Sequence, residues 1–216
     1  MSESRAQNGV FISFEGGDGA GKSTQIGRLA DRLRAAGRDV VVTREPGGSK
    51  GAEAIRKLLV EGDADRWSPL CEALLMYTAR ADHLERTILP ALARGAIVIT
   101  DRFADSTMAY QGFAGALGED TVRKLHALTV GDHDPDLTII LDLPVKDGLQ
   151  RADARGGDAR FESKGVEFQE RVRTAFLEIA KGEPDRCVVV DATGGANAVE
   201  DNIKAALAAR LPRLVD

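Results

Sequence analysis

The sequence predicts a three-layer α/β fold, in which a five-stranded parallel sheet is flanked by helices on both faces. Short apolar, β-branched runs alternate with longer amphipathic stretches along the 216-residue chain, which is the pattern of successive βα units. The runs are apolar at consecutive positions, as expected of strands that are buried on both faces. A glycine-rich segment joins the first run to the first amphipathic stretch, as in many nucleotide-binding βα units.

The predicted elements follow one another in the order expected for this fold. Five runs are predicted to be strands, at residues 10–15, 39–43, 96–100, 137–142 and 186–191. Seven stretches are predicted to be helices, at residues 22–36, 50–61, 69–93, 119–131, 145–154, 165–181 and 196–210. Gly37 and Gly95 end the first and third helices. Since no repeat, low-complexity tract or linker interrupts the pattern, we expect residues 1–216 to form a single domain, with residues 1–8 as a disordered leader.

The composition excludes several classes of function. Hydrophobic residues make up 43% of the chain and charged residues 29%, and the net charge is −5. A chain without a polybasic field or a long apolar run is not expected to bind nucleic acid or to enter a membrane. Cys71 and Cys187 are far apart and lack the spacing of metal ligands, so we interpret them as reduced thiols of a cytoplasmic protein.

Residues 16–23 carry the most specific motif of the chain. They read GGDGAGKS and fit the pattern G-x-x-x-x-G-K-[ST] directly after an apolar run, which predicts a phosphate-binding loop and the P-loop NTPase fold. Lys22 is expected to reach the outer phosphates of ATP, and Ser23 to bind Mg²⁺ at the start of a helix whose dipole favours anions. The predicted ATP-binding residues of this loop are Gly16, Gly17, Asp18, Gly19, Ala20, Gly21, Lys22, Ser23 and Thr24.

Acidic and basic residues follow two other predicted strands. Asp101 ends the third strand, where a second ligand of Mg²⁺ is expected, although a helix cap would also explain it. Arg44 and Arg102 stand at the same rim and suit the capture of a second phosphate, whereas either alone could be a solvated surface residue. Glu45 could orient these arginines or be a plain loop carboxylate.

A glycine-centred segment at residues 151–162 predicts a short mobile lid. Arg151, Arg155 and Arg160 flank two adjacent glycines, and closure of such a segment would bring positive charge to a transferring phosphoryl group. Alternatively, these arginines belong to an exposed helix end, and nearby acidic residues balance their charge.

Two further pairs of residues could frame a bound molecule. Thr107 and Tyr110 would share one helix face, although Tyr110 could equally be a core residue. Met76 and Arg80 lie one helical turn apart and could hold a flat ligand, but ordinary packing with a snorkelling arginine explains them as well.

Together these segments resemble the bacterial thymidylate kinases, enzymes that move the γ-phosphoryl group of ATP onto dTMP. The resemblance covers almost the whole chain, and the motifs that carry it are EGGDGAGKST, TREPGG, DRF-x-x-S-x-x-AYQG, PDLTIILD and the arginine-bearing lid. It implies a homodimer formed through the long helices, with ATP as the donor and Mg²⁺ as the cofactor.

The resemblance also implies roles for individual residues. Asp18 faces the acceptor, Arg44 and Arg102 clamp its phosphate, Arg80 and Thr107 read thymine, and Tyr110 packs under the sugar and disfavours a ribose 2′-hydroxyl. The implied catalytic residues are Lys22, Asp18, Arg102 and Arg155. The implied substrate-binding residues are Arg44, Glu45, Met76, Arg80, Arg102, Thr107, Tyr110 and Gln111.

Family members differ in the position of the catalytic arginine. One type carries it in the phosphate loop, where this chain has Gly19. The resemblance therefore implies the type with the arginine in the lid, with Arg155 as the catalytic residue, Arg160 in support and Arg151 stacked near adenine. Met76 departs from the family, which usually has a Phe that stacks on thymine.

Three other functions are compatible with a phosphate loop. A GTPase switch would need an N-K-x-D tetrapeptide, which the chain lacks, and its D-x-x-G match at residues 191–194 lies on the last strand. A kinase of another nucleotide or of a deoxynucleoside would share the fold, but paired arginines favour an acceptor that already bears a phosphate. A purely regulatory ATP-binding module would not need a second anion site.

Overall fold

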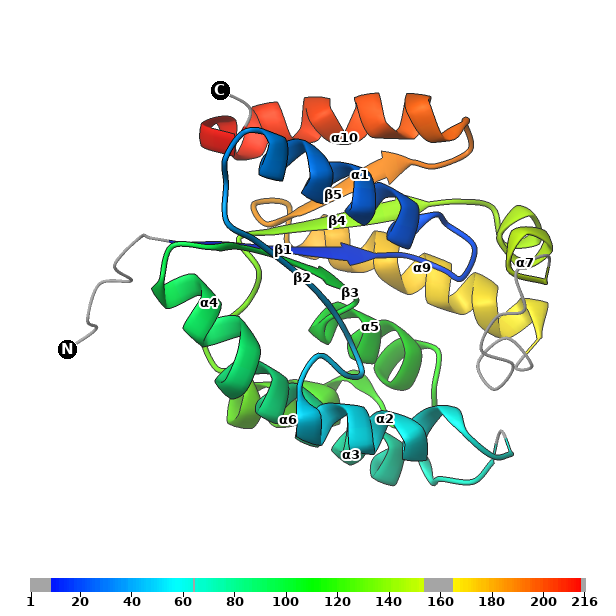
Figure 1. Cartoon of the computed structure of the whole chain (residues 1–216). Helices are drawn as coiled ribbons and strands as arrows, with labels where there is room; N and C mark the ends of the chain where they lie inside the picture. The colour runs from blue at the N-terminus through cyan, green and yellow to red at the C-terminus, as the bar shows by residue number, and fades with distance from the viewer. Residues whose placement is uncertain (1–8, 64, 154–164, 215–216) are drawn as a thin grey trace.

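The sheet has five parallel strands in the order β2-β3-β1-β4-β5. The computed structural model describes residues 9–63, 65–153 and 165–214, and its strands are β1 (Val10–Glu15), β2 (Val40–Arg44), β3 (Ile97–Asp101), β4 (Leu137–Asp142) and β5 (Cys187–Asp191). The parallel strands predicted from the sequence are confirmed, with shifts of one residue at β2, β3 and β5. The central strand β1 lies between β3 and β4 and leads into the phosphate loop (Figure 1). A crevice at this point is the usual ligand site of such sheets.

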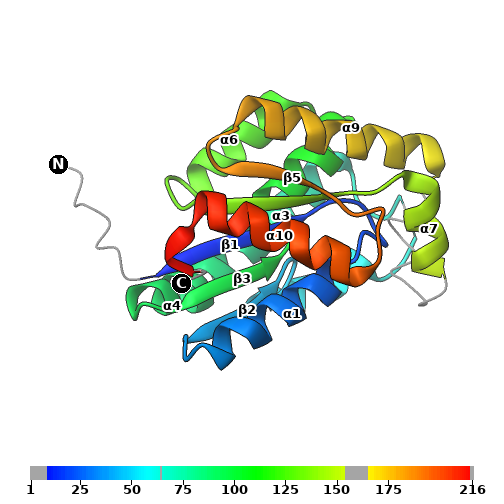
Figure 2. The same cartoon turned by 90° about the horizontal axis from the view of Figure 1, so that it is seen from above.

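Helices cover both faces of the sheet. They are α1 (Lys22–Ala35), α2 (Lys50–Val60), α3 (Pro69–His83), α4 (Leu89–Ala93), α5 (Ala104–Thr107), α6 (Glu119–Thr129), α7 (Val145–Asp153), α9 (Val166–Gly182) and α10 (Ala196–Arg210), with π-helical turns η1 (Leu84–Ile88) and η2 (Met108–Phe113) and a 3₁₀ turn η3 (Pro212–Leu214). Helices α1 and α10 lie on one face, and α9 with the segments from α3 to α6 lies on the other (Figures 1 and 2). The three-layer arrangement is therefore confirmed.

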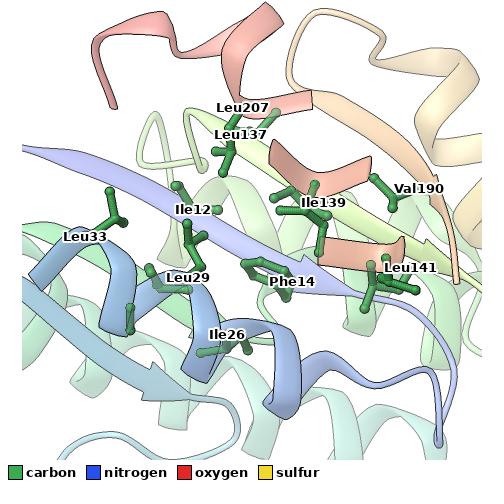
Figure 3. Packing of buried hydrophobic residues seen from close by; sticks show 14 of the residues in the cluster. Ile12, Phe14, Ile26, Leu29, Leu33, Leu137, Ile139, Leu141, Val190 and Leu207 are labelled. Atoms are coloured by element: carbon green, nitrogen blue, oxygen red, sulfur yellow. The ribbon is translucent and has the colours of Figure 1, made fainter. Parts of the chain in front are cut away.

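Apolar clusters close both faces of the sheet. Ile12 and Phe14 of β1 point to the α1 and α10 side, where they pack with Leu29 and Leu207 (Figure 3). Phe11 points to the opposite side and packs with residues of α3 and α6. Successive residues of one strand thus serve two cores, which explains why β1 is apolar at consecutive positions.

The helix predicted for residues 69–93 is not a single α-helix. It consists of α3, the π-helical turn η1 and α4. In η1 the N–H of Leu89 donates to the carbonyl oxygen of Leu84, five residues earlier. Pro90 follows in the first turn of α4 and has no N–H to continue the regular series, so the helix widens there instead.

Local sequence explains how the helices near the predicted site begin. Ser49 and Ser68 precede α2 and α3, and their hydroxyl groups accept from the N–H groups of Ala52 and Cys71 at 3.3 Å. Gly21 precedes α1 in a left-handed conformation with φ 92° and supplies no side-chain cap. The first N–H groups of α1 therefore remain available to an anion. Among the described residues, no helix is long and apolar enough to cross a membrane.

Candidate active site

A cavity of about 410 Å³ opens at the carboxyl ends of β1, β2 and β3. Most of the residues predicted from the sequence line it. They are Asp18, Gly19, Gly21, Lys22, Ser23, Arg44, Glu45, Met76, Arg80, Asp101, Arg102, Thr107, Tyr110 and Gln111. Strand register brings them together, because Arg44 pairs with Asp101 across β2 and β3, and Phe14 pairs with Asp101 across β1 and β3.

The phosphate loop is held in an open turn by its own lysine. Lys22 Nζ donates to the carbonyl oxygens of Gly16 at 3.2 Å and Gly17 at 3.0 Å. Burial, followed by the positive charge of Arg102, lowers the pKa of Lys22 below its usual value. A bound polyphosphate would supply the negative charge that this buried cation lacks.

The rest of the loop lies around this turn. Gly16 and Gly17 line a separate small cavity between the loop, β4 and α9. Ala20 is buried and Thr24 is exposed on α1. Only part of the motif therefore lines the main cavity. The other residues of the loop can contact a phosphate through their backbone N–H groups.

Arg102 forms the centre of a hydrogen-bonded cluster at the cavity wall. Its Nη2 donates to Asp18 Oδ1 at 2.7 Å and to the Tyr110 hydroxyl oxygen at 3.3 Å. Its Nη1 donates to the carbonyl oxygen of Gly16 and to Ser106 Oγ, both at 3.1 Å. Burial opposes ionisation of Asp18, but the charges of Arg102 and Lys22 outweigh it and hold the pKa of that carboxyl below its usual value.

Arg44 reaches the same cavity from the end of β2 and is far more exposed than Arg102. Its Nη2 donates to both carboxylate oxygens of Glu53 at 3.2 and 3.1 Å, and its side chain is 55% exposed. An exposed pair of this kind contributes little to stability. The guanidinium can therefore leave Glu53 for a ligand at low cost.

A buried ion pair closes the other end of the cavity. Arg80 Nε donates to Glu45 Oε2 at 2.7 Å, and the Arg80 side chain is 2% exposed. Arg80 Nη2 donates to the carbonyl oxygen of Phe103 at 3.1 Å and to Thr107 Oγ1 at 3.0 Å. Within the described part of the chain, Nη1 of Arg80 has no hydrogen-bond partner although it is buried. An orphaned donor beside a cavity indicates a place for a ligand acceptor.

Two interpretations of these residues are corrected. Glu45 does not orient Arg44 or Arg102, because its two oxygens contact Arg80 Nε and His83 Nδ1, the latter at 3.0 Å. Arg80 does not snorkel, because its guanidinium is buried against the Tyr77 and Phe103 rings, 4.7 and 5.2 Å from their centroids.

Tyr110 is both a core residue and a cavity wall. Its ring packs against Phe168 and Phe176 at centroid distances of 6.2 and 6.3 Å, and Arg102 lies over it at 5.1 Å. Burial raises the pKa of the Tyr110 hydroxyl well above its usual range. The two alternatives raised for this residue are thus compatible. Gln111 Nε2, on the same π-helical turn, donates to Glu72 Oε1 at 2.8 Å.

The predicted metal ligands lie next to each other. Ser23 Oγ donates to Asp101 Oδ2 at 3.0 Å. The alternative role of Asp101 as a helix cap is wrong, because α5 begins after Phe103 and has no side-chain cap. Among the described residues, no group of three or more His, Cys, Asp or Glu side chains could hold a metal ion, so a cation here would depend on ligands from a nucleotide and water.

The lid can be compared with the structure only at its first residue. Arg155 and Arg160 lie outside the described residues, as does most of the segment 151–162. Arg151 lies at the end of α7, and its guanidinium donates to the carbonyl oxygens of Ala192 and Thr193 at 3.4 and 3.5 Å. It therefore faces the loop after β5 and not the main cavity.

Several residues of this site were not anticipated. His83 follows Met76 and Arg80 at helical spacing, a signal that could have revealed it. Arg56 and Ser106 also line the cavity. Glu15, the last residue of β1, contacts the turn that carries Arg102, and a charged residue at the end of an apolar strand was the available signal.

Comparison with known proteins agrees with this geometry. The family profile described as thymidylate kinase matches residues 14–203. A thymidylate kinase of Caulobacter vibrioides is 64% identical over 203 residues, covering 94% of this chain and 98% of the relative. A thymidylate kinase of Dinoroseobacter shibae is 58% identical over 186 residues, covering 86% and 89%.

Solved structures agree as well. The crystal structure of thymidylate kinase from Ehrlichia chaffeensis superposes with a TM-score of 0.76 at 35% identity, covering 93% of this chain and 99% of that one. The P-loop NTPase fold predicted from the loop at residues 16–23 is thereby confirmed. On the family profile, the identities and the shared fold together, this chain belongs to the thymidylate kinase family.

Proposed function

We propose that this protein transfers the γ-phosphoryl group of ATP to the 5′-phosphate of dTMP, giving dTDP and ADP. The observation that carries the proposal is one cavity with two anion-binding centres at one end and an orphaned buried donor at the other. The phosphate loop with Lys22 suits the donor, and Arg102 with Arg44 suits the phosphate of the acceptor. Family membership favours the same reaction.

The base end of the cavity favours thymine over cytosine. Arg80 Nη1 needs an acceptor, and thymine offers a carbonyl oxygen where cytosine carries an amino group. A cytosine amino group would face this donor with another donor and leave both unpaired, which is a strong source of discrimination. Thr107, already bonded to Arg80, would contact the same edge of the base.

The sugar would lie over Tyr110. That ring is wedged between Phe168, Phe176 and the Arg102 guanidinium, so it cannot move aside for a larger group. We infer that Tyr110 excludes a ribose 2′-hydroxyl, and that Asp18 and Arg102 are aligned at the phosphate end of the acceptor.

The oxygen ligands at the loop fit Mg²⁺. Ser23 and Asp101 present a hydroxyl and a carboxylate next to each other, which are hard ligands of the kind that Mg²⁺ prefers. These two residues would hold the ion, which when bound neutralises charge on the donor phosphates.

The lid residues complete the proposal. We assign Arg155, with Arg160 in support, to stabilisation of the transferring phosphoryl group, because Gly19 leaves the loop without an arginine. Arg151, with its contacts to the loop after β5, suits the adenine side of the donor site.

We also propose a homodimer, as the family resemblance implies. Helices α2 and α3 pack against each other and carry the exposed leucines Leu58, Leu70 and Leu74, which supply apolar surface for a partner copy. Measurement of the molar mass in solution tests it, and a monomeric mass at micromolar concentration contradicts it. The cytoplasmic location expected from the sequence stays a prediction.

An ADP-release assay across nucleoside monophosphates tests the function. We expect turnover of dTMP well above that of dUMP, dCMP, dGMP and UMP, and loss of activity in Lys22→Ala. Equal turnover of UMP would contradict the role of Tyr110. Thymidine as the favoured acceptor would identify a nucleoside kinase instead. No turnover with any acceptor would favour a GTPase switch or a regulatory ATP-binding module.

A further inference from the structure

We infer that Glu15 is a positioning residue that holds Arg102 ready for the phosphate of the acceptor. The inference rests on the proposed function, in which Arg102 binds that phosphate. Glu15 ends β1 and is fully buried. It does not line the main cavity, and it precedes the first glycine of the G-x-x-x-x-G-K-[ST] pattern.

Glu15 contacts both the backbone and the side chain of the Arg102 segment. Its Oε1 accepts from the N–H of Phe103 at 2.6 Å, the residue directly after Arg102. Its Oε2 accepts from Ser106 Oγ at 2.6 Å, and the same Ser106 oxygen accepts from Arg102 Nη1 at 3.1 Å. One carboxyl group therefore fixes the peptide that follows Arg102 and, through one hydroxyl, its guanidinium.

The turn needs such support because its backbone is unfavourable. Arg102 has a φ of 70°, and it is the one residue other than glycine with a positive φ in the described part of the chain. Left-handed backbone at a long side chain persists only where its surroundings enforce it. The N–H of Arg102 donates to the carbonyl oxygen of Phe14 at 2.9 Å, and Thr100 Oγ1 donates to the Arg102 carbonyl oxygen at 2.9 Å. Glu15 holds the next peptide group, because it accepts from the N–H of Phe103.

The conformation of this turn decides where the guanidinium lies. With a left-handed Arg102, the side chain points back over the phosphate loop and reaches Gly16 and Asp18. The extended or right-handed alternatives would direct Cβ elsewhere. Glu15 thus links the strand that carries the donor loop to the arginine of the acceptor site.

A carboxyl group at this position lowers the stability of the fold, because the site disfavours its ionised form. Burial, with the nearby negative charge of Asp105, raises the pKa of Glu15 to about 8, which reports how strongly the site disfavours the charge. An apolar residue of similar size would avoid that penalty, but it would leave the Phe103 N–H and the Ser106 hydroxyl without their acceptor.

Calorimetric binding of dTMP and of thymidine tests the inference, because only dTMP carries the phosphate. The variants are Glu15→Leu, which removes both acceptors, Glu15→Gln, which keeps one, and Ser106→Ala, which breaks the link to the guanidinium. Ser13→Ala is the matched control. Ser13 is a buried polar residue on the same strand and the same face, and its hydroxyl contacts Thr138 Oγ1 at 2.9 Å.

We expect Glu15→Leu to weaken dTMP binding about tenfold, the factor typical of one lost hydrogen bond to a charged group, while thymidine binding changes less than about twofold. Glu15→Gln should weaken dTMP binding less than Glu15→Leu does. Ser106→Ala should also lower the affinity for dTMP, and Ser13→Ala should leave the ratio of the dTMP and thymidine affinities unchanged.

Unchanged dTMP affinity in Glu15→Leu, or an equal loss for dTMP and thymidine, overturns the inference. If Glu15→Leu does not fold, Ser106→Ala decides in the same way. A wild-type protein that binds thymidine as tightly as dTMP would instead contradict the proposed function, so the two failures are distinguishable.

Discussion

Replacement of Gly19 by arginine should not supply a working loop arginine. It should instead lower the stability of the protein. A Cβ at Gly19 would overlap the carbonyl oxygen of Gly148 on α7 and lie 2.7 Å from its carbonyl carbon. A Cβ at Gly148 would in turn lie 2.6 Å from the carbonyl oxygen of Asp18. The loop and the helix that precedes the lid are in backbone contact, which leaves no room for a side chain at either position.

Two effects set the magnitude. Gly19 has a φ of 75°, and a left-handed conformation costs a residue with a Cβ about 1–2 kcal/mol. The overlap with backbone adds about 1–3 kcal/mol, the usual range for overpacking. The free energy of unfolding of Gly19→Ala should therefore fall by about 2–5 kcal/mol, and at about 2–4 °C per kcal/mol for a chain of this size the Tm should fall by roughly 4–20 °C.

Thermal unfolding and steady-state kinetics check this prediction. Gly17→Ala is the control in the same loop, because nothing lies within 4 Å of its added Cβ, and it should keep the wild-type Tm within about 2 °C. Gly19→Arg in an Arg155→Ala background should remain inactive. A Gly19→Ala variant as stable as Gly17→Ala, or recovery of wild-type kcat by Gly19→Arg in that background, would refute the reasoning.

Three further predictions concern catalysis, the base and pH. Arg155→Ala should lower kcat by about 10³-fold or more and leave KM nearly unchanged in steady-state ADP release; an intact kcat would contradict the assignment of the lid. Met76→Phe should tighten dTMP binding by roughly 2–10-fold through ring stacking, measured by calorimetry, and weaker binding would exclude stacking. Because burial and Asp105 raise the pKa of Glu15 from 4.5 to about 8 in spite of Arg102, the folded state holds a proton that the unfolded chain releases between these values. The stability that Glu15 contributes is complete below pH 4.5 and is lost as the pH rises through 8, at a slope of at most about 1.4 kcal/mol per pH unit. The free energy of unfolding, measured with urea at pH 5.5, 7 and 8.5, should fall with this slope, and the slope should be smaller in Glu15→Gln. An unchanged slope in the variant would show that other groups cause the pH dependence.

The layers of the fold were predictable because each depends on local sequence. A run such as Val10–Glu15 is buried on both sides wherever it pairs in a parallel sheet, and the spacing of glycines, Lys22 and Ser23 is readable without coordinates. The π-helical turn at η1 was not predictable as such, since Pro90 signals a break without specifying its form.

The partners of the site residues were less predictable than the residues themselves. From sequence, Glu45 was equally suited to Arg44, which is adjacent to it, and to Arg102. The structure pairs it with Arg80 and His83 instead. Adjacent residues of a strand end point in different directions, so sequence proximity does not decide which charges meet.

The sequence by itself determined the fold class, the donor loop and most of the residue types that the cavity needs. Only the tertiary structure decided how they act on one another. Asp18 meets Arg102 across 84 positions of the chain, and Glu15 meets Phe103 across 88, because the register of β1 against β3 places Phe14 opposite Asp101. Such contacts depend on strand pairing and on a left-handed turn at Arg102, and both are set by packing of the whole sheet and not by local sequence.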